Sequence, residues 1–219
     1  IPEYRLPKEV LDEEIALLEK MGVTMVTNTK IGEDISFETI RRDFDAVCAG
    51  IGAWVSTGVR CKGEDAEGVI GGIDFLRKVV RNEPIDLGKK VAIVGGGNTA
   101  MDACRTAVRL GADKVYNIYR RTKDEMPADM IEIEEAEEEG VIFLNLTNPL
   151  EIISDENGHC RQMVLQVMEL GEPDASGRRA PIPVEGKTET IDVDTVILAI
   201  GQRVNAEGID GVELTRKGG

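Results

Sequence analysis

The sequence predicts an α/β fold with a parallel sheet and an antiparallel β insertion. Apolar strands alternate with helical segments between residues 91 and 146, which is the pattern of a parallel sheet joined by crossover helices. From residue 150 onward, short β segments separated by polar turns such as Glu156-Asn157-Gly158 replace this alternation. Such turns are typical of antiparallel strands.

The first part of the chain predicts two helices and two strands. Apolar residues recur at helical spacing after Pro7 and stop at Gly22, which predicts an amphipathic helix between these residues. Three shorter elements are expected to follow. These are a strand at 23–27, a brief helix at 37–42 and a buried strand that runs into glycines at 44–53.

The middle of the chain predicts the parallel sheet. Glycine and charged residues between Gly58 and Gly72 indicate a linker, which a helix at 73–80 follows. A strand–helix–strand unit of about 30 residues predicts a parallel pair of strands. The alternating strands and helices are expected at 91–94, 98–110, 115–119, 129–139 and 141–146.

The last part of the chain predicts the β insertion and one more buried strand. The expected antiparallel segments lie at 150–153, 162–168 and 188–193, and a strand at 193–201 ends in glycine. These elements divide the chain into a partial domain at 1–66, a complete domain at 67–204 and the start of a return segment at 205–219.

The charge and cysteine content exclude several classes of partner. The chain has 41 acidic and 26 basic side chains, and this net charge of −15 disfavours binding to nucleic acid or to an anionic membrane. Its apolar runs are far shorter than the roughly 20 residues that span a bilayer. Four scattered cysteines lack metal-site spacing and fit a reducing cytoplasm, with Cys48 and Cys104 as small core residues.

A glycine-rich turn follows the strand at 91–94 and opens the next helix. Its pattern is Gly95-x-Gly97-x-x-Ala100. Gly95 permits the tight turn, Gly97 lets the backbone approach a pyrophosphate, and Ala100 lets the helix pack closely on the strand. The alternative is a turn that only connects two packed elements. The strand before it and the helix after it favour dinucleotide binding, with the pyrophosphate at the helix N-terminus.

The end of the second strand indicates which dinucleotide is bound. A site for NAD(H) places an acidic residue there to bind the ribose 2′-hydroxyl, whereas this strand ends in Tyr119-Arg120-Arg121. Two guanidinium groups suit a 2′-phosphate because they form bidentate, charge-assisted hydrogen bonds. The sequence therefore predicts NADP(H). The alternative is that both arginines pair with the acidic helix that follows.

No acid–base or nucleophilic constellation follows the turn. His159 is the only histidine and lies in a polar turn, where we expect it to be a solvated residue. A stand-alone dehydrogenase with an organic substrate is therefore disfavoured. Hydride transfer between a nicotinamide and a flavin needs positioning more than protein acid–base groups.

Several segments resemble the small (beta) subunit of NADPH-dependent glutamate synthase and related FAD-dependent pyridine nucleotide oxidoreductases. The segments are 1–8, 44–52, 94–102, 119–121, 126–128 and 194–202. The resemblance implies nested Rossmann-like domains for FAD and NADPH. It also implies that the main FAD loop precedes Ile1, so that 1–66 is part of the FAD-binding domain and 67–204 is the NADPH-binding domain.

The resemblance also implies roles for individual residues. Along the NADPH pyrophosphate we expect Gly95, Gly97, Asn98, Thr99 and Ala100. Arg120 and Arg121 would hold the 2′-phosphate. Gly52, Ala199 and Gly201 belong to two strand-end motifs that would lie beside the cofactors.

By resemblance, the intact parent oxidises NADPH and passes the electrons through FAD and iron–sulfur centres to a larger catalytic or electron-accepting subunit. This portion alone is expected to be inactive and not to retain FAD. The segments Met130–Gly140 and Met168–Arg179 are more similar to relatives that serve other electron acceptors than to glutamate synthase. The alternative function is an NADP(H)-binding regulatory or subunit-docking module without catalysis of its own.

Overall fold

The computed structural model describes residues 1–173, 175, 177 and 179–215, which form two compact units. The larger unit spans residues 56–201, and the smaller unit is made mainly of residues 3–55 and the segment from 202 onward. Two short strands, β1 (Val55–Ser56) and β10 (Gln202–Arg203), pair with each other. The α/β class predicted from the sequence is confirmed.

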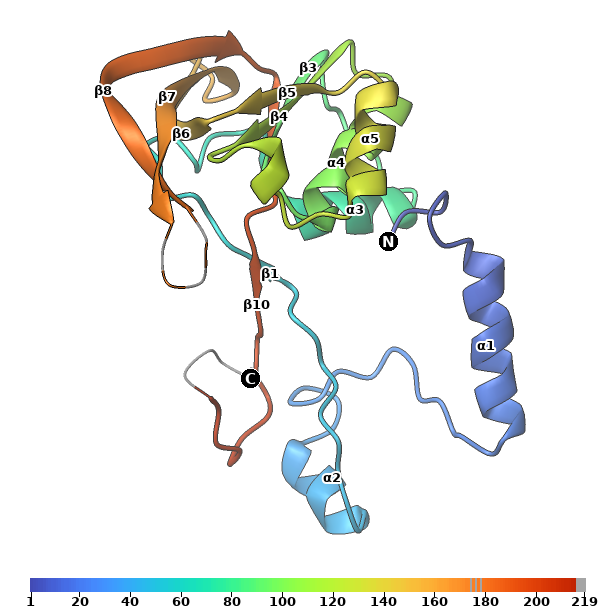
Figure 1. The fold of residues 1–219 in the computed structure, drawn as a ribbon. Helices are drawn as coiled ribbons and strands as arrows, with labels where there is room; N and C mark the ends of the chain where they lie inside the picture. Colours follow the sequence, from blue (N-terminus) through green and yellow to red (C-terminus); the bar gives the residue numbers. More distant parts are fainter. Residues whose placement is uncertain (174, 176, 178, 216–219) are drawn as a thin grey trace. The chain divides into compact units, whose positions relative to one another are not determined.

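The larger unit is built on a parallel sheet. Among the described residues the sheet has five strands in the order β2-β9-β3-β4-β5, and every neighbouring pair is parallel. Figure 1 labels β3, β4 and β5 of this sheet. The strands are β2 (Val69–Gly71), β3 (Lys90–Val94), β4 (Lys114–Tyr119), β5 (Ile142–Asn145) and β9 (Thr195–Leu198). Strand β3 lies at the centre of this order, and its residues are almost wholly buried, as is typical of a parallel strand whose two faces are both covered.

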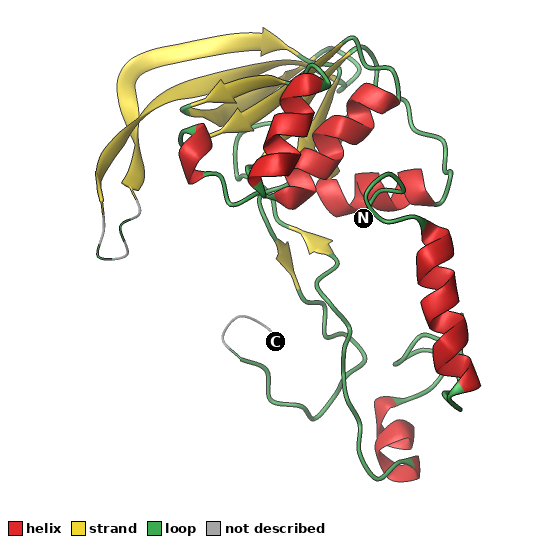
Figure 2. Cartoon of the chain, turned by 45° about the vertical axis from the view of Figure 1, so that its right-hand side comes forward, coloured by secondary structure: helices red, strands yellow, loops and turns green. Residues whose placement is uncertain are grey.

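The two faces of β3 pack against different layers. Val91 and Ile93 belong to a core cluster formed with the helices, whereas Ala92 and Val94 belong to a second cluster formed with the antiparallel strands. This division follows from the alternation of side chains along a strand. The helices are α3 (Gly72–Val80), α4 (Asn98–Arg109) and α5 (Met130–Glu138), which pack together on the first face (Figure 2).

The antiparallel insertion is longer than the sequence predicts. The described strands β6 (Thr147–Ser154), β7 (Cys160–Pro173) and β8 (Arg179–Asp192) form a sheet in this order. The sequence underestimates β8 because Pro181 and Pro183 interrupt the strand pattern. An edge strand tolerates proline because one side of its backbone has no partner strand.

The smaller unit contains α1 (Lys8–Lys20) and α2 (Phe37–Asp43), as predicted. The prediction of strands at 23–27 and 44–53 is wrong. A strand needs a neighbouring strand for its backbone groups, and none of the described residues forms a ladder with either segment. Their apolar side chains are accordingly exposed, and Cys48 is exposed with them, whereas Cys104 is buried as expected.

Ion pairs join helices α4 and α5. The Arg105 side chain is only 6% exposed, and its guanidinium nitrogens lie 2.7 Å from Glu132, 2.5 Å from Glu135 and 2.9 Å from Glu139. Arg109 also pairs with Glu139, at 2.8 Å. Hydrogen bonds from these two arginines lower the pKa of Glu139 below its ordinary value, and the bond from Arg109 has the larger effect.

The lowered pKa of Glu139 predicts a loss of stability in acid. In the unfolded chain a glutamate titrates near pH 4.3. The stabilisation by the ionised carboxylate is therefore present above about that pH and is lost as the pH falls through the lower folded-state pKa. Thermal unfolding can be followed between about pH 7 and pH 3. Over this range the Glu139→Gln variant should lose less of its thermal stability than the unsubstituted chain loses.

A matched control for this measurement is Glu134→Gln, because Glu134 is exposed on the same helix. This control should keep the pH dependence of the unsubstituted chain. The same pH dependence in Glu139→Gln as in the unsubstituted chain would show that the ion pairs of Glu139 do not contribute to the acid sensitivity of the fold.

Candidate functional site

The turn between β3 and α4 is held from both sides. The Gly95 N–H donates to the carbonyl of Ile118 in β4 at 3.0 Å. On the β9 side, a Cβ added to Gly95 would lie 2.3 Å from the Ala199 carbonyl oxygen. Gly95 also has a φ of +145°, which disfavours an L side chain. Both the conformation and the close approach therefore require glycine at this position.

The next two glycines differ in their surroundings. A Cβ at Gly96 would lie 2.5 Å from the ring of Tyr119, so Gly96 is packed against β4. A Cβ at Gly97 would meet only Pro127, at 4.0 Å. Gly97 is the N-cap of α4 and has an extended backbone. The approach to the helix N-terminus is thus open at Gly97, where an anion could reach unpaired N–H groups.

The first residues of α4 have structural contacts as well as a place beside the turn. The Asn98 side chain forms a reciprocal pair with Asp129: its Nδ2 donates to the carboxylate at 3.0 Å, and its Oδ1 accepts from the Asp129 N–H at 2.9 Å. Ala100 is fully buried. The Thr99 methyl lies near Gly72, the first residue of α3. The Asn98 side chain therefore joins α4 to the start of α5.

The two arginines after β4 have different environments. Arg120 is exposed, whereas Arg121 is 7% exposed and its Nε donates to the Arg179 carbonyl of β8 at 2.8 Å. Hydrogen bonds from Thr122 lower the pKa of nearby Glu125, and the charges of Arg179 and Arg121 lower it further. Arg121 is thus fixed by the antiparallel insertion, while Arg120 extends into solvent.

The acidic helix α5 has other basic partners. In the described part of the chain, its carboxylates pair with Arg105, Arg109 and Lys123. The sequence-based alternative assigned this pairing to Arg120 and Arg121. The pairing of Arg105 had a signal in the sequence, because a basic residue in an otherwise small and apolar helix face needs a charged partner when it is buried.

The strand-end motifs are divided between the units. Ala199 follows β9, and its N–H donates to Val94 at 2.8 Å, so it lies directly beside the glycine turn. Gly201, two residues further on, accepts a hydrogen bond from the Thr57 N–H at 3.0 Å. Gly52 lies in the smaller unit, in an exposed segment with a φ of +68°. The turn, the end of β4 and Ala199 are therefore brought together within the larger unit.

Two residues of the site were not found by sequence reasoning. Tyr119 packs over Gly96 and donates its hydroxyl to the Glu125 carbonyl at 2.8 Å. Asn117 is fully buried in β4, and its Nδ2 donates to the Gly95 carbonyl at 2.9 Å. Asn117 had a signal in the sequence, since it is an amide within a strand that is otherwise expected to be apolar on both faces.

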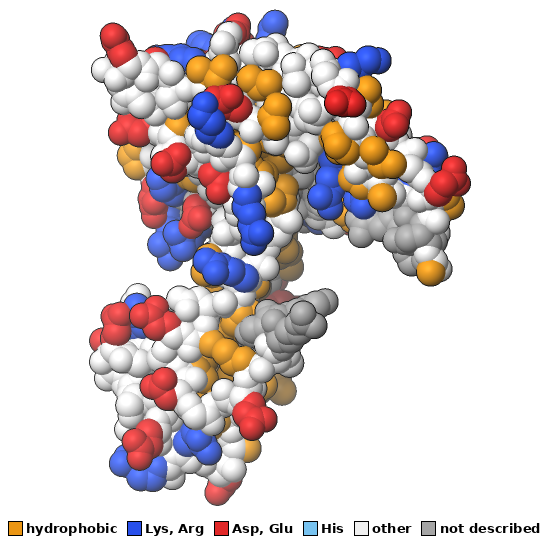
Figure 3. Space-filling model, turned by 90° about the vertical axis from the view of Figure 1, so that its left-hand side faces the viewer, with side chains coloured by type: hydrophobic (Ala, Val, Ile, Leu, Met, Phe, Trp, Pro, Cys, Tyr) orange, Lys and Arg blue, Asp and Glu red, His pale blue; other side chains and the backbone are white. Residues whose placement is uncertain are grey.

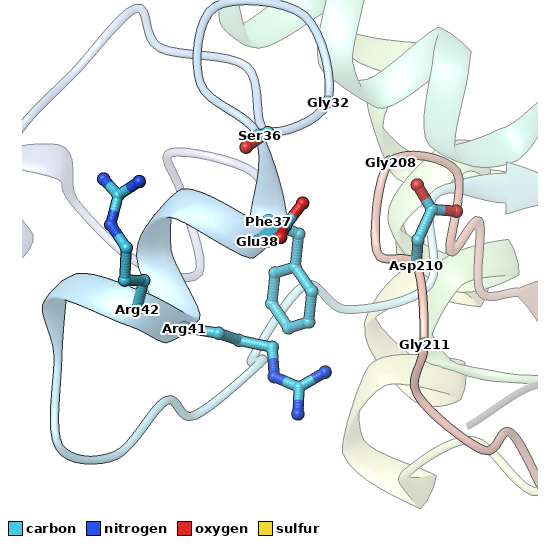
Figure 4. A pocket seen from close by; sticks show the side chains of 9 residues that line it. All are labelled: Gly32, Ser36, Phe37, Glu38, Arg41, Arg42, Gly208, Asp210 and Gly211. Atoms are coloured by element: carbon cyan, nitrogen blue, oxygen red, sulfur yellow. The ribbon is translucent and has the colours of Figure 1, made fainter.

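A cavity of about 640 Å³ lies in the smaller unit (Figure 4). It is lined by α2 and by residues 208–211, and it contains both basic and acidic side chains. These are Arg41, Arg42, Glu38 and Asp210. None of the residues that the sequence assigns to nucleotide binding lines this cavity, so it is separate from the glycine turn.

Three further features of the described residues concern the surface charge, the length of the helices and the side chains suited to a metal ion. On the face shown in Figure 3, basic and acidic side chains are interspersed. No helix in the described part has both the length and the apolar character to cross a bilayer. The described residues include no cluster of three or more His, Cys, Asp or Glu side chains suited to a metal ion.

A parallel sheet with a glycine-rich turn at the start of a helix defines an α/β protein of the Rossmann class. Residues 38–219 match the family described as pyridine nucleotide-disulphide oxidoreductase. The chain belongs to this family of oxidoreductases.

Relatives of the chain agree with the resemblance seen in the sequence. The chain is 44% identical to the NADPH-Fe(3+) oxidoreductase subunit beta of Geobacter sulfurreducens, over 99% of this chain and 33% of the relative. It is 37% identical to the glutamate synthase [NADPH] small chain of Escherichia coli, over 93% and 45% of the two chains. The resemblance is confirmed, and the chain spans between a third and a half of these relatives.

A solved structure shows the same fold. The FprA protein of Mycobacterium tuberculosis in complex with NADPH superposes with a TM-score of 0.72 at 19% identity, over 86% of this chain and 56% of that one. At this level of identity the similarity supports the fold alone.

The geometry of the turn predicts different effects for its glycines. Gly95→Ala should lower the free energy of unfolding by about 1–3 kcal/mol, because the new methyl group would clash with Ala199 and the backbone would be strained. Gly97→Ala should cost much less, since its surroundings are open. Urea denaturation of both variants measures the difference. Equal losses of stability would contradict the close approach at Gly95.

Proposed function

We propose that this chain is the NADPH-binding portion of a flavin-dependent oxidoreductase that passes electrons from NADPH through FAD and iron–sulfur centres to a partner subunit. The observation that carries the proposal is the open N-terminus of α4 at Gly97, together with an exposed arginine, Arg120, directly after the adjacent strand β4. The first feature suits a pyrophosphate, and the second suits a 2′-phosphate.

The turn would bind the pyrophosphate through backbone groups. Gly95, Gly97, Asn98, Thr99 and Ala100 lie at or next to the N-terminus of α4, where N–H groups and the helix dipole favour an anion. Gly97 allows close approach because a Cβ there would meet only one neighbouring atom within 4 Å. The Asn98 side chain would act indirectly, since it holds the start of α5.

The arginines would select NADPH over NADH. Arg120 is exposed and free to approach a 2′-phosphate at the end of β4, and Arg121 is held next to it by the Arg179 carbonyl. The names of the relatives support this choice of cofactor, since they include an NADPH-Fe(3+) oxidoreductase, an NADP(+)-dependent formate dehydrogenase and an NADPH glutamate synthase. Bound NADPH would supply a hydride to the flavin.

The remaining assignments concern the whole protein. We assign residues 67–204 to the NADPH-binding domain, and 1–66 and 205–219 to part of the FAD-binding domain, where Gly52 would lie beside FAD. Ala199 lies next to the turn, so this residue and Gly201 would lie near the nicotinamide half of NADPH. FAD would depend mainly on other parts of the protein. The relatives are named as subunits or small chains, which supports a larger partner.

The four free cysteines of the chain support a cytoplasmic location. A reducing compartment keeps such thiols from forming disulfides. Membership in a family of oxidoreductases favours the catalytic assignment over a purely regulatory or docking module.

Calorimetric titration with NADPH and NADH tests the proposed function. The double variant Arg120→Ala, Arg121→Ala should weaken NADPH binding by about a hundredfold, because charge-assisted hydrogen bonds to the 2′-phosphate are lost. Its affinity for NADH should not change. The control Arg81→Ala removes an exposed arginine beyond α3 and should leave both affinities unchanged.

If the unsubstituted chain binds NADH as tightly as NADPH, the assignment of the arginines is wrong. If it binds neither nucleotide, the proposed site at the turn is wrong for this chain.

A further inference from the structure

Asn117 is a buried polar residue that contacts the glycine turn from strand β4. It has no exposed surface. Its Nδ2 lies 2.9 Å from the Gly95 carbonyl oxygen and 3.7 Å from the Cys104 sulfur, so both amide hydrogens have an acceptor. Its Oδ1 has no hydrogen-bond partner among the described residues.

The two backbone groups of Gly95 are both bound by β4. The Gly95 N–H donates to Ile118, and the Gly95 carbonyl accepts from Asn117. The Gly95 carbonyl and the Gly96 N–H belong to one planar, trans peptide group and point in opposite directions. When Asn117 holds the carbonyl toward β4, the Gly96 N–H must therefore point away from β4.

We propose that Asn117 is a positioning residue of the nucleotide site, which sets the orientation of the Gly95–Gly96 peptide so that its N–H, and not its carbonyl, is presented to the pyrophosphate. This inference rests on the proposed binding of NADPH at the turn. Without a donor at position 117, the buried Gly95 carbonyl has no partner on β4, and rotation of the peptide would turn an electronegative oxygen toward the anion. A carbonyl in that position repels phosphate.

Packing alone does not account for an asparagine at this position. A buried polar atom without a partner destabilises a fold, and Oδ1 of Asn117 is such an atom. An apolar side chain of similar size would avoid this cost and would suit a strand buried on both faces, but it would leave the Gly95 carbonyl without its donor. The amide hydrogen bond to Gly95 is what such a side chain could not provide. Asparagine at 117 therefore fits a functional requirement of the turn.

The experiment compares ligands that do and do not contain a pyrophosphate. NADPH and NADH both contain it, whereas 2′-AMP carries the adenosine 2′-phosphate without it. Asn117→Leu should weaken NADPH and NADH by the same factor, roughly tenfold for one hydrogen-bonded group, and leave the affinity for 2′-AMP unchanged. Calorimetry measures the dinucleotides, and ligand-observed NMR measures the weaker 2′-AMP.

Two further variants keep the test independent of folding defects. Thr106→Val is the control. Thr106 lies in α4, and its Oγ1 is also a buried polar atom without a hydrogen-bond partner, which the substitution removes. Its affinities should match those of the unsubstituted chain. Asn117→Val also lacks a donor and has a side chain that suits a strand, so it should weaken both dinucleotides if Asn117→Leu fails to fold.

The possible results are distinguishable. Unchanged dinucleotide affinity in a folded Asn117 variant overturns the positioning role while leaving the proposed function intact. An equal loss of affinity for 2′-AMP also overturns it, because the substitution then disturbs the whole site. If the unsubstituted chain binds neither the dinucleotides nor 2′-AMP, the proposed function fails and the positioning role fails with it.

Discussion

The close approach of the Gly95 backbone to the ends of two neighbouring strands is the constraint on which the rest of the site depends. The Gly95 N–H donates a hydrogen bond to the Ile118 carbonyl of β4, and the Gly95 Cα lies against the Ala199 carbonyl beyond β9. This contact fixes where α4 begins relative to three adjacent strands. Because the strands are parallel, their carboxyl ends meet at one edge, so the residues that follow each strand converge there.

The antiparallel insertion is part of this arrangement. Its side chains cover the face of β3 opposite the helices, in a cluster with Ala92 and Val94, and the Arg179 carbonyl of β8 holds Arg121. The insertion therefore completes the core and also fixes one of the two arginines at the end of β4. A change in β8 can reach the proposed nucleotide site through this hydrogen bond, although β8 is distant from the turn in sequence.

The parts of the fold that depend on local pattern were predictable, and the parts that depend on distant partners were not. The strand at 91–94, its turn and the helix after it follow from apolar spacing and glycines that act over a few residues. The strand at 44–53 did not form, although its apolar pattern is equally strong, because a ladder requires a neighbour and none of the described residues provides one. The bonds of Asn98 to Asp129 and of Arg121 to Arg179 span 31 and 58 residues, so no local pattern could indicate them.

The net charge of −15 does not oppose the binding of an anion at the turn. The carboxylates of Glu132, Glu135, Glu137 and Glu139 pair with Arg105, Arg109 or Lys123. Glu125 lies near the charges of Arg121 and Arg179. Exposed charges further away are screened beyond about 8 Å at physiological ionic strength. The charges closest to the turn are therefore the positive end of α4, the arginines after β4 and the Asp129 carboxylate, which accepts a hydrogen bond from Asn98. Local pairing of the acidic residues makes the proposed polyphosphate site compatible with an acidic protein.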